Sequence, residues 1–461
     1  MALVTLARLF AGPFQIAGIA VNAPLNPEGA FGLAMTILLA CRFTKDAPAP
    51  RSSRVALAAG GAALVSVISQ ARVVGLYFLS DDFILVQQAN QWTWSNLVPV
   101  FTSGGGDGFF RPVGLVSLAV NATWAGSDPR LWHATAVALH TVNVVLVTWL
   151  AARVGLSTST AFLAGALFAL HGTHPEASAW IAGRFDVLAV FFTLGGMLLF
   201  TIGRRWTRIA ALACCLLAVF SKEAAFVFPV LLVLLARFQR RSLRSTIPFL
   251  ALTAVAFLYR WIMQGGIGGY VSPETGRPVV LALGLATTAK AVFVRLWTSL
   301  YFPINWSVDP STTLAALAVA MAAALLWLAA RSRPGAIVWF ALLALLVSIL
   351  PPLHLLGGAA DLSGGRLLYL PSVWFCLMLG AAVEGLSAKI ARTVCAATLI
   401  LFHWAALQHN LDSWEAASRQ VREICLSAAE GIVPSSVPKD IRGVPALANG
   451  FQECVLESRK P

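Results

Sequence analysis

Two adjacent carboxylates, Asp81 and Asp82, stand directly before the short apolar run Phe83–Val86. Carboxylates that lie side by side against apolar surroundings repel each other and lose solvation, and both effects raise a carboxyl pKa. A pair of this kind is suited to act as a general base or to bind a metal ion. The alternative interpretation is ordinary polarity at the end of a helix.

A second group of polar residues occupies the segment LHGTHPEASAWIAGRFD, residues 170–186. The side chains that could do chemistry there are His171, His174, Glu176, Trp180, Arg184 and Asp186. We expect acid–base or substrate-positioning roles, with Trp180 either stacking on a sugar or anchoring the chain in the membrane interface. The segment has neither HExxH nor zinc-ligand spacing, so no metal ligands are predicted and a divalent cation is left open. The alternative is a solvated turn.

Three further ionisable residues stand between or at the ends of apolar runs: Lys222 and Glu223 in FSKEAAF, and Arg366 in GGRLLYLP. Ionisable groups at this depth are costly and usually functional. Neighbouring helix residues do not face each other, so Lys222 and Glu223 each need another partner. Cations in these positions suit a lipid phosphate. For Arg366, a side chain that reaches back to the interface is the alternative.

The composition limits which elements can position these residues. The chain has 461 residues, of which 58% are hydrophobic and only 11% are charged, whereas soluble domains carry about 25% charged residues. This excludes a soluble enzyme, a disordered chain and a disulfide-rich secreted module, and it leaves a polytopic membrane protein. The net charge of +13 does not indicate nucleic-acid binding, because Lys and Arg stand in short clusters between apolar runs.

The sequence predicts an all-α polytopic membrane protein with about eleven transmembrane helices, each needing about 20 apolar residues. The predicted crossings are 55–78, 131–152, 158–173, 186–203, 207–221, 224–238, 246–262, 311–330, 335–352, 367–386 and 391–407. With the first loop outside, the basic clusters Arg204–Arg208, Arg237–Arg244 and Arg331–Arg333 fall inside, as the positive-inside rule requires. The candidate site residues then fall outside.

Two other apolar stretches are predicted to be interfacial helices on the outer side. Arg111–Gly126 is short and is followed by Asp128. Leu285–Phe302 places polar residues on one broad arc and apolar residues on the opposite arc, as an amphipathic helix at the interface does. Counting either stretch as a crossing would reverse every later loop and put the Arg clusters outside.

The chain divides into three predicted parts. Residues 1–54 are an uncertain N-terminal segment. The sequence leaves open whether this segment is a signal or anchor, or whether the protein truly starts at Met35. Residues 55–407 form the transmembrane domain that carries the candidate site. Residues 408–461 are a polar tail, outside by parity, in which Cys425 and Cys454 either form a disulfide or are two free thiols.

Taken together, the polar segments resemble the GT-C glycosyltransferases. The likeness is to the transmembrane part of the O-mannosyltransferases that carry tetratricopeptide repeats, and to their bacterial relatives. It covers roughly residues 55–420, through Leu79–Asp82, FRPVGLVSLAVNATWAG, LWHATAVALHTVNVVLV, LHGTHPEASAWIAGRFDVLA, SKEAAFVFP and RLLYLPSVWF. The chain departs from the family at Gly172, where proline is usual, and at Gly365, where an acid is usual.

The resemblance implies a GT-C-like bundle, a polyprenyl-phosphate sugar donor and mannosyltransferase-like transfer of a hexose or pentose at an outward-facing site. Asp82 and Asp81 match the position of the family's catalytic base. The other motif positions match His174, Glu176, Arg184, Lys222, Glu223 and Arg366. The predicted topology favours the same donor, because nucleotide sugars are cytoplasmic whereas a lipid carrier presents its sugar outside.

The expected location is a bacterial inner membrane, with the N-terminus inside and the C-terminus outside. The expected partners are the lipid donor, the bilayer and an acceptor that is a protein, a glycan or a lipid. Two other classes are left open. A transporter or flippase would carry charges at mid-depth in two related halves. An O-antigen polymerase or acyltransferase would work at the same surface, the latter through a histidine such as His174.

Overall fold

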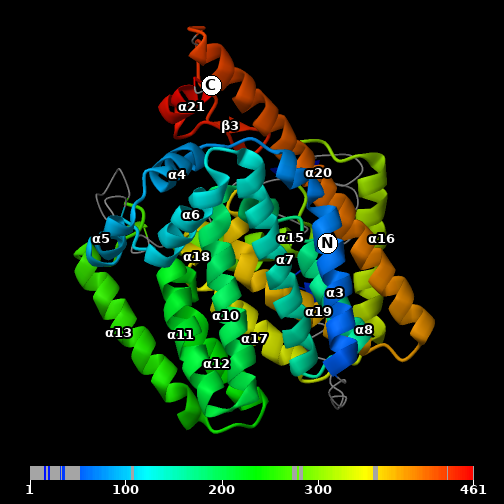
Figure 1. Ribbon diagram of the computed structural model, residues 1–461. Coiled ribbons are helices and arrows are strands. Elements are labelled where there is room, and N and C mark those ends of the chain that lie inside the picture. Colours follow the sequence, from blue (N-terminus) through cyan, green and yellow to red (C-terminus); the bar gives the residue numbers. More distant parts are fainter. Residues whose placement is uncertain are drawn as a thin grey trace.

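The protein is an almost entirely helical bundle in a computed structural model (Figure 1). The structure describes residues 15–16, 19–20, 32, 34–36, 52–104, 108–271, 278–279, 284–356, 362–432 and 434–459. Within these ranges the strands form two short antiparallel pairs, β1 (Gln15–Ile16) with β2 (Ile19–Ala20) and β3 (Asp440–Ile441) with β4 (Val444–Pro445). The predicted all-α class is therefore confirmed. Most of the predicted segment 1–54 lies outside the described residues.

The helices that coincide with the predicted crossings lie side by side in the body of the bundle (Figure 1). They are α3 (Ser52–Ser69), α7 (Pro129–Arg153), α8 (Thr158–Ala169), α10 (Arg184–Ile202), α11 (Arg205–Ser221), α12 (Phe228–Phe238), α13 (Ile247–Gln264), α16 (Thr312–Arg331), α17 (Ile337–Ile349), α19 (Tyr369–Glu384) and α20 (Lys389–Ala429). One of these helices lies at each of the predicted crossings.

Six helical stretches of the described chain are long and apolar enough to cross a membrane: Pro129–Arg153, Ile181–Ile202, Leu243–Gln264, Thr312–Arg331, Gly365–Glu384 and Lys389–Ala429. Four apolar helices are shorter: Ser53–Ser69, Pro112–Ala125, Thr158–Ala169 and Ile337–Ile349. The 12 residues of α8 span about 18 Å, less than the ~30 Å hydrocarbon core. The expected count of about eleven crossings is therefore not confirmed.

Helices α8 and α19 pack together at the centre of the bundle. Every residue of α19 from Tyr369 to Val383 is buried. Gly165 in α8 allows the close approach to α7, because a Cβ there would lie 2.0 Å from the Thr148 hydroxyl oxygen. A central helix that is enclosed along its length is held firmly, and Arg366 stands just before its first turn.

The short elements position most of the candidate site. Helices α4, α5 and α6 lie at the end of the bundle from which the C-terminal part projects (Figure 1). The short elements are η1 (Ala71–Gly75), α4 (Asp81–Asn90), η2 (Trp94–Asn96), α5 (Leu97–Thr102), α6 (Pro112–Ala125), α9 (Pro175–Ser178), η3 (Ile181–Gly183), η4 (Glu223–Val227), η5 (Leu243–Thr246), α18 (Leu353–Leu356) and η8 (Gly365–Leu368).

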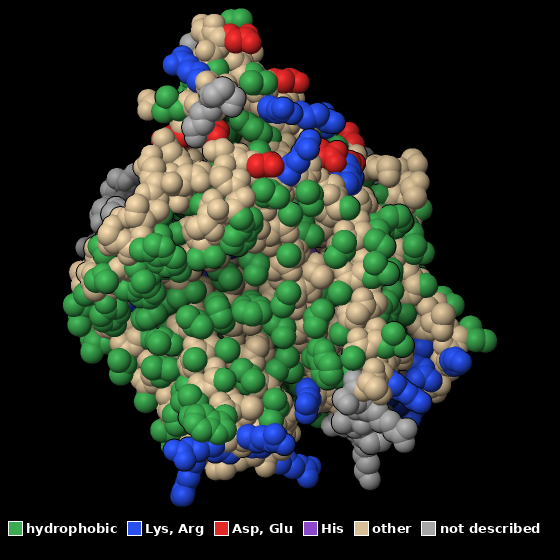
Figure 2. Space-filling view, viewed as in Figure 1, with side chains coloured by type: hydrophobic (Ala, Val, Ile, Leu, Met, Phe, Trp, Pro, Cys, Tyr) green, Lys and Arg blue, Asp and Glu red, His purple; other side chains and the backbone are tan. Residues whose placement is uncertain are grey.

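The two ends of the bundle differ in charge on the face shown in Figure 2. Lys and Arg side chains gather at the lower end, whereas the visible Asp and Glu side chains lie at the upper end among other Lys and Arg side chains, and a broad hydrophobic band separates the two ends. The lower end holds the turns after α10 and α12 (Figure 1). A hydrophobic band between two polar ends is the arrangement that a bilayer imposes.

The structure corrects three sequence predictions. First, α20 does not end with the predicted last crossing at 407 but continues without a break to Ala429 in the tail. Second, α3 ends at Ser69, earlier than the predicted 78, because the chain turns through η1.

The third correction concerns Leu285–Phe302, for which the sequence predicts one amphipathic helix at the interface. It forms α14 (Leu285–Lys290), a π-helical turn η7 (Ala291–Arg295) and α15 (Leu296–Tyr301). All six residues of α15 are buried. Among its buried polar side chains, Thr298 donates a hydrogen bond to the Val294 carbonyl, which satisfies its hydroxyl inside the protein. Only the first half is exposed enough to suit an interface.

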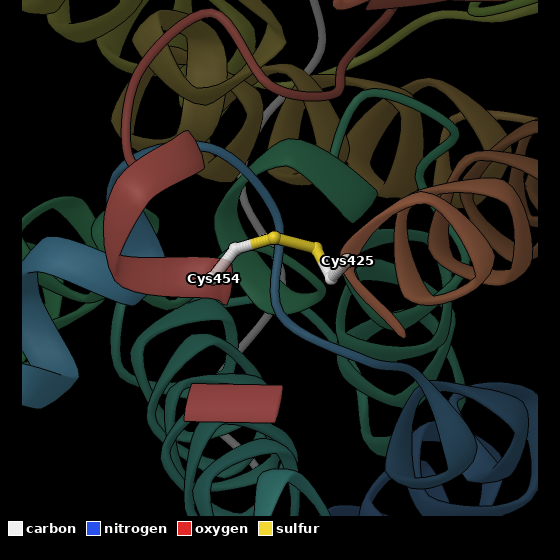
Figure 3. The surroundings of a disulfide bond; sticks show 2 residues. All are labelled: Cys425 and Cys454. Carbon is white, nitrogen blue, oxygen red and sulfur yellow. A yellow bond between two sulfur atoms is a disulfide. The ribbon is translucent and has the colours of Figure 1, made fainter. Parts of the chain in front are cut away.

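The C-terminal tail folds back onto the end of the bundle that carries α4. After α20, the β3–β4 hairpin and α21 (Phe451–Ser458) return toward α4. Cys425 on α20 and Cys454 on α21 form a disulfide, which decides between the two alternatives that the sequence left open (Figure 3). The cysteines elsewhere in the described chain, Cys214, Cys215, Cys376 and Cys395, are free.

Candidate functional site

The adjacent carboxylates Asp81 and Asp82 open α4, and the structure gives them different surroundings. Asp82 is fully buried, and its two oxygens accept hydrogen bonds from the backbone N–H groups of Leu79, at 3.2 Å, and Ala182, at 3.1 Å. Asp81 is only partly buried and accepts a 2.7 Å hydrogen bond from the Asn449 side-chain amide. Asp82 therefore ties α4 to the turn at Ala182, whereas Asp81 has an accessible carboxylate.

Burial raises the pKa of Asp82 well above its ordinary value, partly offset by the backbone N–H groups that it accepts from, and the neighbouring charge of Asp81 raises it further. The sequence predicts a raised carboxyl pKa in this pair. The residue with the raised pKa is Asp82, which is sealed from solvent.

Glu176 and Arg366 form an ion pair between α9 and η8. Arg366 Nη1 lies 2.5 Å from Glu176 Oε1, and the Arg366 backbone N–H donates to Oε2 at 3.3 Å. Burial raises the pKa of Glu176, and the positive charge of Arg366 opposes the rise. Snorkelling is therefore not the role of Arg366, because its guanidinium has a defined carboxylate partner.

Trp180 connects this ion pair to the acidic segment. The Arg366 guanidinium lies over the indole ring, 4.5 Å from its centroid, and the indole N–H donates to the Leu79 carbonyl at 3.2 Å. The negative charge of Asp81 acts on Arg366 as well. The segments at residues 79–82, 176–180 and 366 thus converge.

Lys222 pairs with Asp186 where α11 ends. Both side chains are at least 90% buried. Burial lowers the pKa of Lys222 to about 8, Asp186 opposes this effect, and the positive charges of Arg111 and Arg366 lower the pKa further. Lys222 thus lies within electrostatic reach of both arginines.

Glu223 is shared by two arginines, Arg111 and Arg260. Arg111 donates to Glu223 Oε2 at 2.9 and 3.1 Å and to Oε1 at 3.3 Å, and Arg260 Nη2 lies 3.4 Å from Oε1. Burial raises the pKa of Glu223, but the charge and hydrogen bonds of Arg111 and the charge of Arg260 together outweigh this effect and lower the pKa to about 2. Lys222 and Glu223 therefore have separate partners, as the sequence predicts.

Sequence reasoning missed Arg111 and Arg260 as site residues. From the sequence, Arg111 is only the boundary of an apolar stretch. Arg260 is 5% exposed and stands within the apolar helix α13. A single arginine inside an apolar helix is the signal that could have identified it.

An apolar cavity of 260 Å³ adjoins Arg111 between α4, α5 and α6. Its apolar lining includes Leu85, Trp92, Val100, Phe109 and Leu115. The Arg111 guanidinium stacks over Phe109 at 4.1 Å from the ring centroid. The cavity can thus hold an apolar chain whose anionic end reaches the arginine. The predicted interfacial stretch Arg111–Gly126 contributes Arg111, Leu115 and Leu118 to the lining, whereas the lining includes no residue of the other predicted interfacial stretch, 285–302.

Arg184 is the other buried cation of the predicted set. Its side chain is 1% exposed, and none of its guanidinium nitrogens has a hydrogen-bond partner among the described residues. It stacks over Trp132, with 5.2 Å to the ring centroid, and the charge of Asp82 acts on it. A buried guanidinium with no direct partner is electrostatically suited to an anion.

His171 and His174 lie in the core and not among the ion pairs. His174 Nε2 is 2.8 Å from the Ser372 hydroxyl, and that hydroxyl donates to the Tyr369 carbonyl at 2.9 Å. The imidazole is therefore the donor to Ser372, and both histidine side chains are fully buried. This arrangement does not suit an acyltransferase, which needs a reachable histidine.

The two glycines at which the chain departs from the family both stand at close backbone approaches. A Cβ at Gly172 would lie 2.3 Å from the Pro303 carbonyl oxygen, and one at Gly365 would lie 2.8 Å from the Thr173 carbonyl oxygen. Any side chain at these positions would require the neighbouring backbone to move.

The described part of the chain holds no group of three or more His, Cys, Asp or Glu residues that could bind a metal ion. Glu176, Asp186 and Glu223 are each paired with cations and not with one another. The chemistry available at the site consists of one accessible carboxylate, several cations and an apolar cavity.

The chain is similar over part of its length to several proteins named protein O-mannosyl-transferases. It is 38% identical to TMTC1 of Mus musculus over 86 residues, which are 18% of this chain and 9% of the relative. It is 33% identical to Tmtc1 of Drosophila melanogaster over 125 residues, 26% and 15% of the two chains. It is 28% identical to Tmtc2 of the same organism over 222 residues, 44% and 23% of the two chains.

These matches span less than a quarter of the length of each of these three relatives. No protein-family model matches the chain. No solved structure matches it either. The similarity is therefore to part of the named O-mannosyl-transferases.

Proposed function

We propose that the protein is a GT-C-like glycosyltransferase that moves a sugar from a polyprenyl-phosphate donor to an acceptor at the extracytoplasmic face of a membrane. The observation that carries this proposal is the convergence of the accessible Asp81 carboxylate with buried cations beside an apolar cavity. The partial similarity to protein O-mannosyl-transferases supports the same class of reaction.

The proposed reaction is a single displacement at the anomeric carbon. Asp81 accepts the proton of the acceptor hydroxyl as the hydroxyl oxygen bonds to that carbon. The bond from the carbon to the phosphate oxygen breaks, and its electron pair stays on the departing lipid phosphate. A positioned base contributes about 10²–10⁴-fold to such a step.

The sequence alone does not separate Asp81 from Asp82 as the base. The surroundings favour Asp81, because a base must reach the acceptor hydroxyl within hydrogen-bond distance. Asp82 is sealed by Leu79 and Ala182. We assign Asp82 to holding the turn of the chain that presents Asp81.

The phosphate would be held by cations that outnumber their carboxylate partners. Glu176, Asp186 and Glu223 are paired with four cations, and Arg184 has no hydrogen-bonded partner among the described residues. The departing phosphate gains negative charge as the bond breaks, and preorganised cations stabilise developing charge of this kind. The lipid chain of the donor would occupy the cavity beside Arg111.

The proposed membrane orientation places Asp81 outside and the basic end of the bundle in the cytoplasm, with the N-terminus inside and the C-terminus outside. The Lys and Arg side chains that gather at one end, on a face where the visible Asp and Glu side chains lie at the other, support it (Figure 2). The Cys425–Cys454 disulfide at the Asp81 end also supports it, because disulfides persist in oxidising compartments. A bacterial inner membrane is the proposed location.

The proposal is tested with purified protein, a panel of polyprenyl-phosphate sugars and candidate acceptor peptides, glycans and lipids, with and without EDTA. We expect acceptor-dependent release of polyprenyl phosphate for one sugar class, and loss of release in the double variant D81N/D82N. The matched control is Asp412→Asn, which removes an exposed carboxylate that pairs with Arg72. Full transfer by the double variant would remove the proposed base.

A further inference from the structure

The C-terminal tail reaches the carboxylate that we assign as the base. Asn449, in the loop before α21, donates its side-chain amide to Asp81 Oδ1 at 2.7 Å. The two residues are 368 positions apart in the chain. This contact engages one oxygen of Asp81, while the carboxylate stays partly exposed.

The backbone of the tail is also docked on the residue before Asp81. The Ser80 N–H donates to the Ala446 carbonyl at 2.7 Å. Gly450 has a φ of +77° and comes so close that a Cβ there would lie 2.6 Å from the Ser80 carbonyl oxygen. Ser80 itself has a φ of +49°, an unfavourable conformation for serine that persists only where the surroundings impose it.

Several contacts fix the tail in this place. The disulfide joins α21 to α20 five residues after Asn449 (Figure 3). Asn305 donates to the Arg442 carbonyl at 2.8 Å and to the Ser413 hydroxyl at 3.0 Å, so the hairpin is held to α20. A small cavity of 20 Å³ is lined by Glu176 and by Gly443–Pro445, so the tail also borders the Glu176–Arg366 pair.

We propose that Asn449 is a positioning residue for Asp81, and that the tail closed by Cys425 and Cys454 holds Asn449 in place. This inference rests on the proposed function. The amide fixes the carboxylate through Oδ1, which leaves Oδ2 to accept the proton of the acceptor hydroxyl. The tail is thus part of the catalytic apparatus, although it lies outside the transmembrane domain.

The test compares Asn449→Asp, Asn449→Ala and Asn449→Gln with the wild type. Asp has the shape of Asn but replaces the donor by a second carboxylate, so we expect kcat to fall by about 10–100-fold, the scale of a misplaced catalytic group. The donor KM should change less than about twofold, because Asn449 does not line the lipid cavity. The Asn449→Gln variant keeps an amide donor and should restore part of kcat.

The matched control is Asn90→Asp, which places the same new charge on an exposed asparagine of α4 whose amide donates to the Gly126 carbonyl. It should leave kcat unchanged. Normal kcat in both N449D and N449A, with an active wild type, would overturn the positioning role and leave the proposed function standing. An inactive wild type against every donor would instead count against the proposed function.

The disulfide is tested separately. Reduction of the wild type should lower kcat, as the N449A substitution does. The double variant C425S/C454S should have a lowered kcat without reductant, and the reductant should not change it. Hydrogen exchange in the first turn of α4 should rise in each case. Unchanged kcat and unchanged exchange after complete reduction would overturn the role of the tail.

Discussion

The guanidinium of Arg366 lies over the ring of Trp180, 4.5 Å from its centroid. Through this contact, the start of α19, a long helix that is buried from Tyr369 to Val383, is joined to the segment that presents the two aspartates. An Arg side chain in such a place combines a planar stack with an ion pair, and a lysine cannot reproduce this combination.

We therefore expect Arg366→Lys to lower kcat/KM by about tenfold, although the positive charge is kept, because a lost stack and a lost ion-pair geometry together cost roughly 1–2 kcal/mol. Arg331→Lys, at the exposed basic end of α16, is the matched control and should have wild-type kinetics. Steady-state release of polyprenyl phosphate measures both. Equal kinetics for the two variants would show that charge alone suffices at position 366.

Single substitutions should distinguish the roles of Asp81 and Asp82. Asp81→Asn should lower kcat by about 10²–10⁴-fold, the contribution of a positioned base, and leave thermal stability unchanged. Asp82→Asn should instead destabilise the protein by about 1–3 kcal/mol, because an amide cannot accept from both backbone N–H groups. Thermal unfolding in detergent and single-turnover transfer distinguish these outcomes. The opposite pattern would make Asp82 the base.

The activity should depend on pH through Lys222. Its pKa is lowered to about 8, chiefly by burial, so its positive charge is present below pH 8 and is lost as the pH rises through this value. We expect kcat/KM, which reports the free enzyme, to fall above about pH 8. Lys222→Arg should remove the fall because arginine stays charged. A fall that persists unchanged in K222R would have to come from another group.

The lowered pKa of Lys222 should make stability rise with pH, although it makes kcat/KM fall. In the unfolded chain Lys222 keeps its proton up to the ordinary lysine pKa of 10.5, so the unfolded chain binds more protons than the folded protein between about pH 8 and 10.5. The contribution of Lys222 to stability therefore rises with pH across this window. Comparing the thermal midpoints of the wild type and K222R across this range would isolate it.

The apolar cavity should select for the length of the lipid chain. Val100 lines it and Val98, on the same short helix α5, does not and is 67% exposed. Val100→Trp should raise the KM for long-chain polyprenyl donors by about tenfold and change kcat little, because lost uniform binding appears in KM. The matched control is Val98→Trp, and this variant should have the wild-type KM for the donors. A KM for V100W that is equally raised for short and long donors would argue against a lipid in the cavity.

Apolar periodicity and the lengths of apolar runs predict the helices well, because burial in lipid leaves a strong compositional signal. The continuity of α20 escapes this reasoning although no Gly or Pro interrupts Lys389–Ala429, because a change from apolar to polar residues resembles the end of a helix. Polarity reports the surroundings of a helix, whereas its continuity depends on the backbone.

The partners of the site residues are harder to predict. Lys222 and Glu223 stand out in the sequence, but Arg111 is 112 residues away from Glu223 in the chain and Asn449 is 368 away from Asp81. Spacing along a single sequence carries no information about such pairs, since they depend on how whole helices pack. His171 and His174 show the converse, because polar residues close in sequence can be core residues.

The unbroken course of α20 also has a mechanical consequence. Its 41 residues make a rod of about 60 Å, roughly twice the hydrocarbon thickness, and Cys425 near its far end is bonded to the segment that carries Asn449. A change in bilayer thickness tilts transmembrane helices, and a small tilt of a long rod displaces its tip most. The lipid composition of the membrane would thereby change the position of Asn449 relative to Asp81.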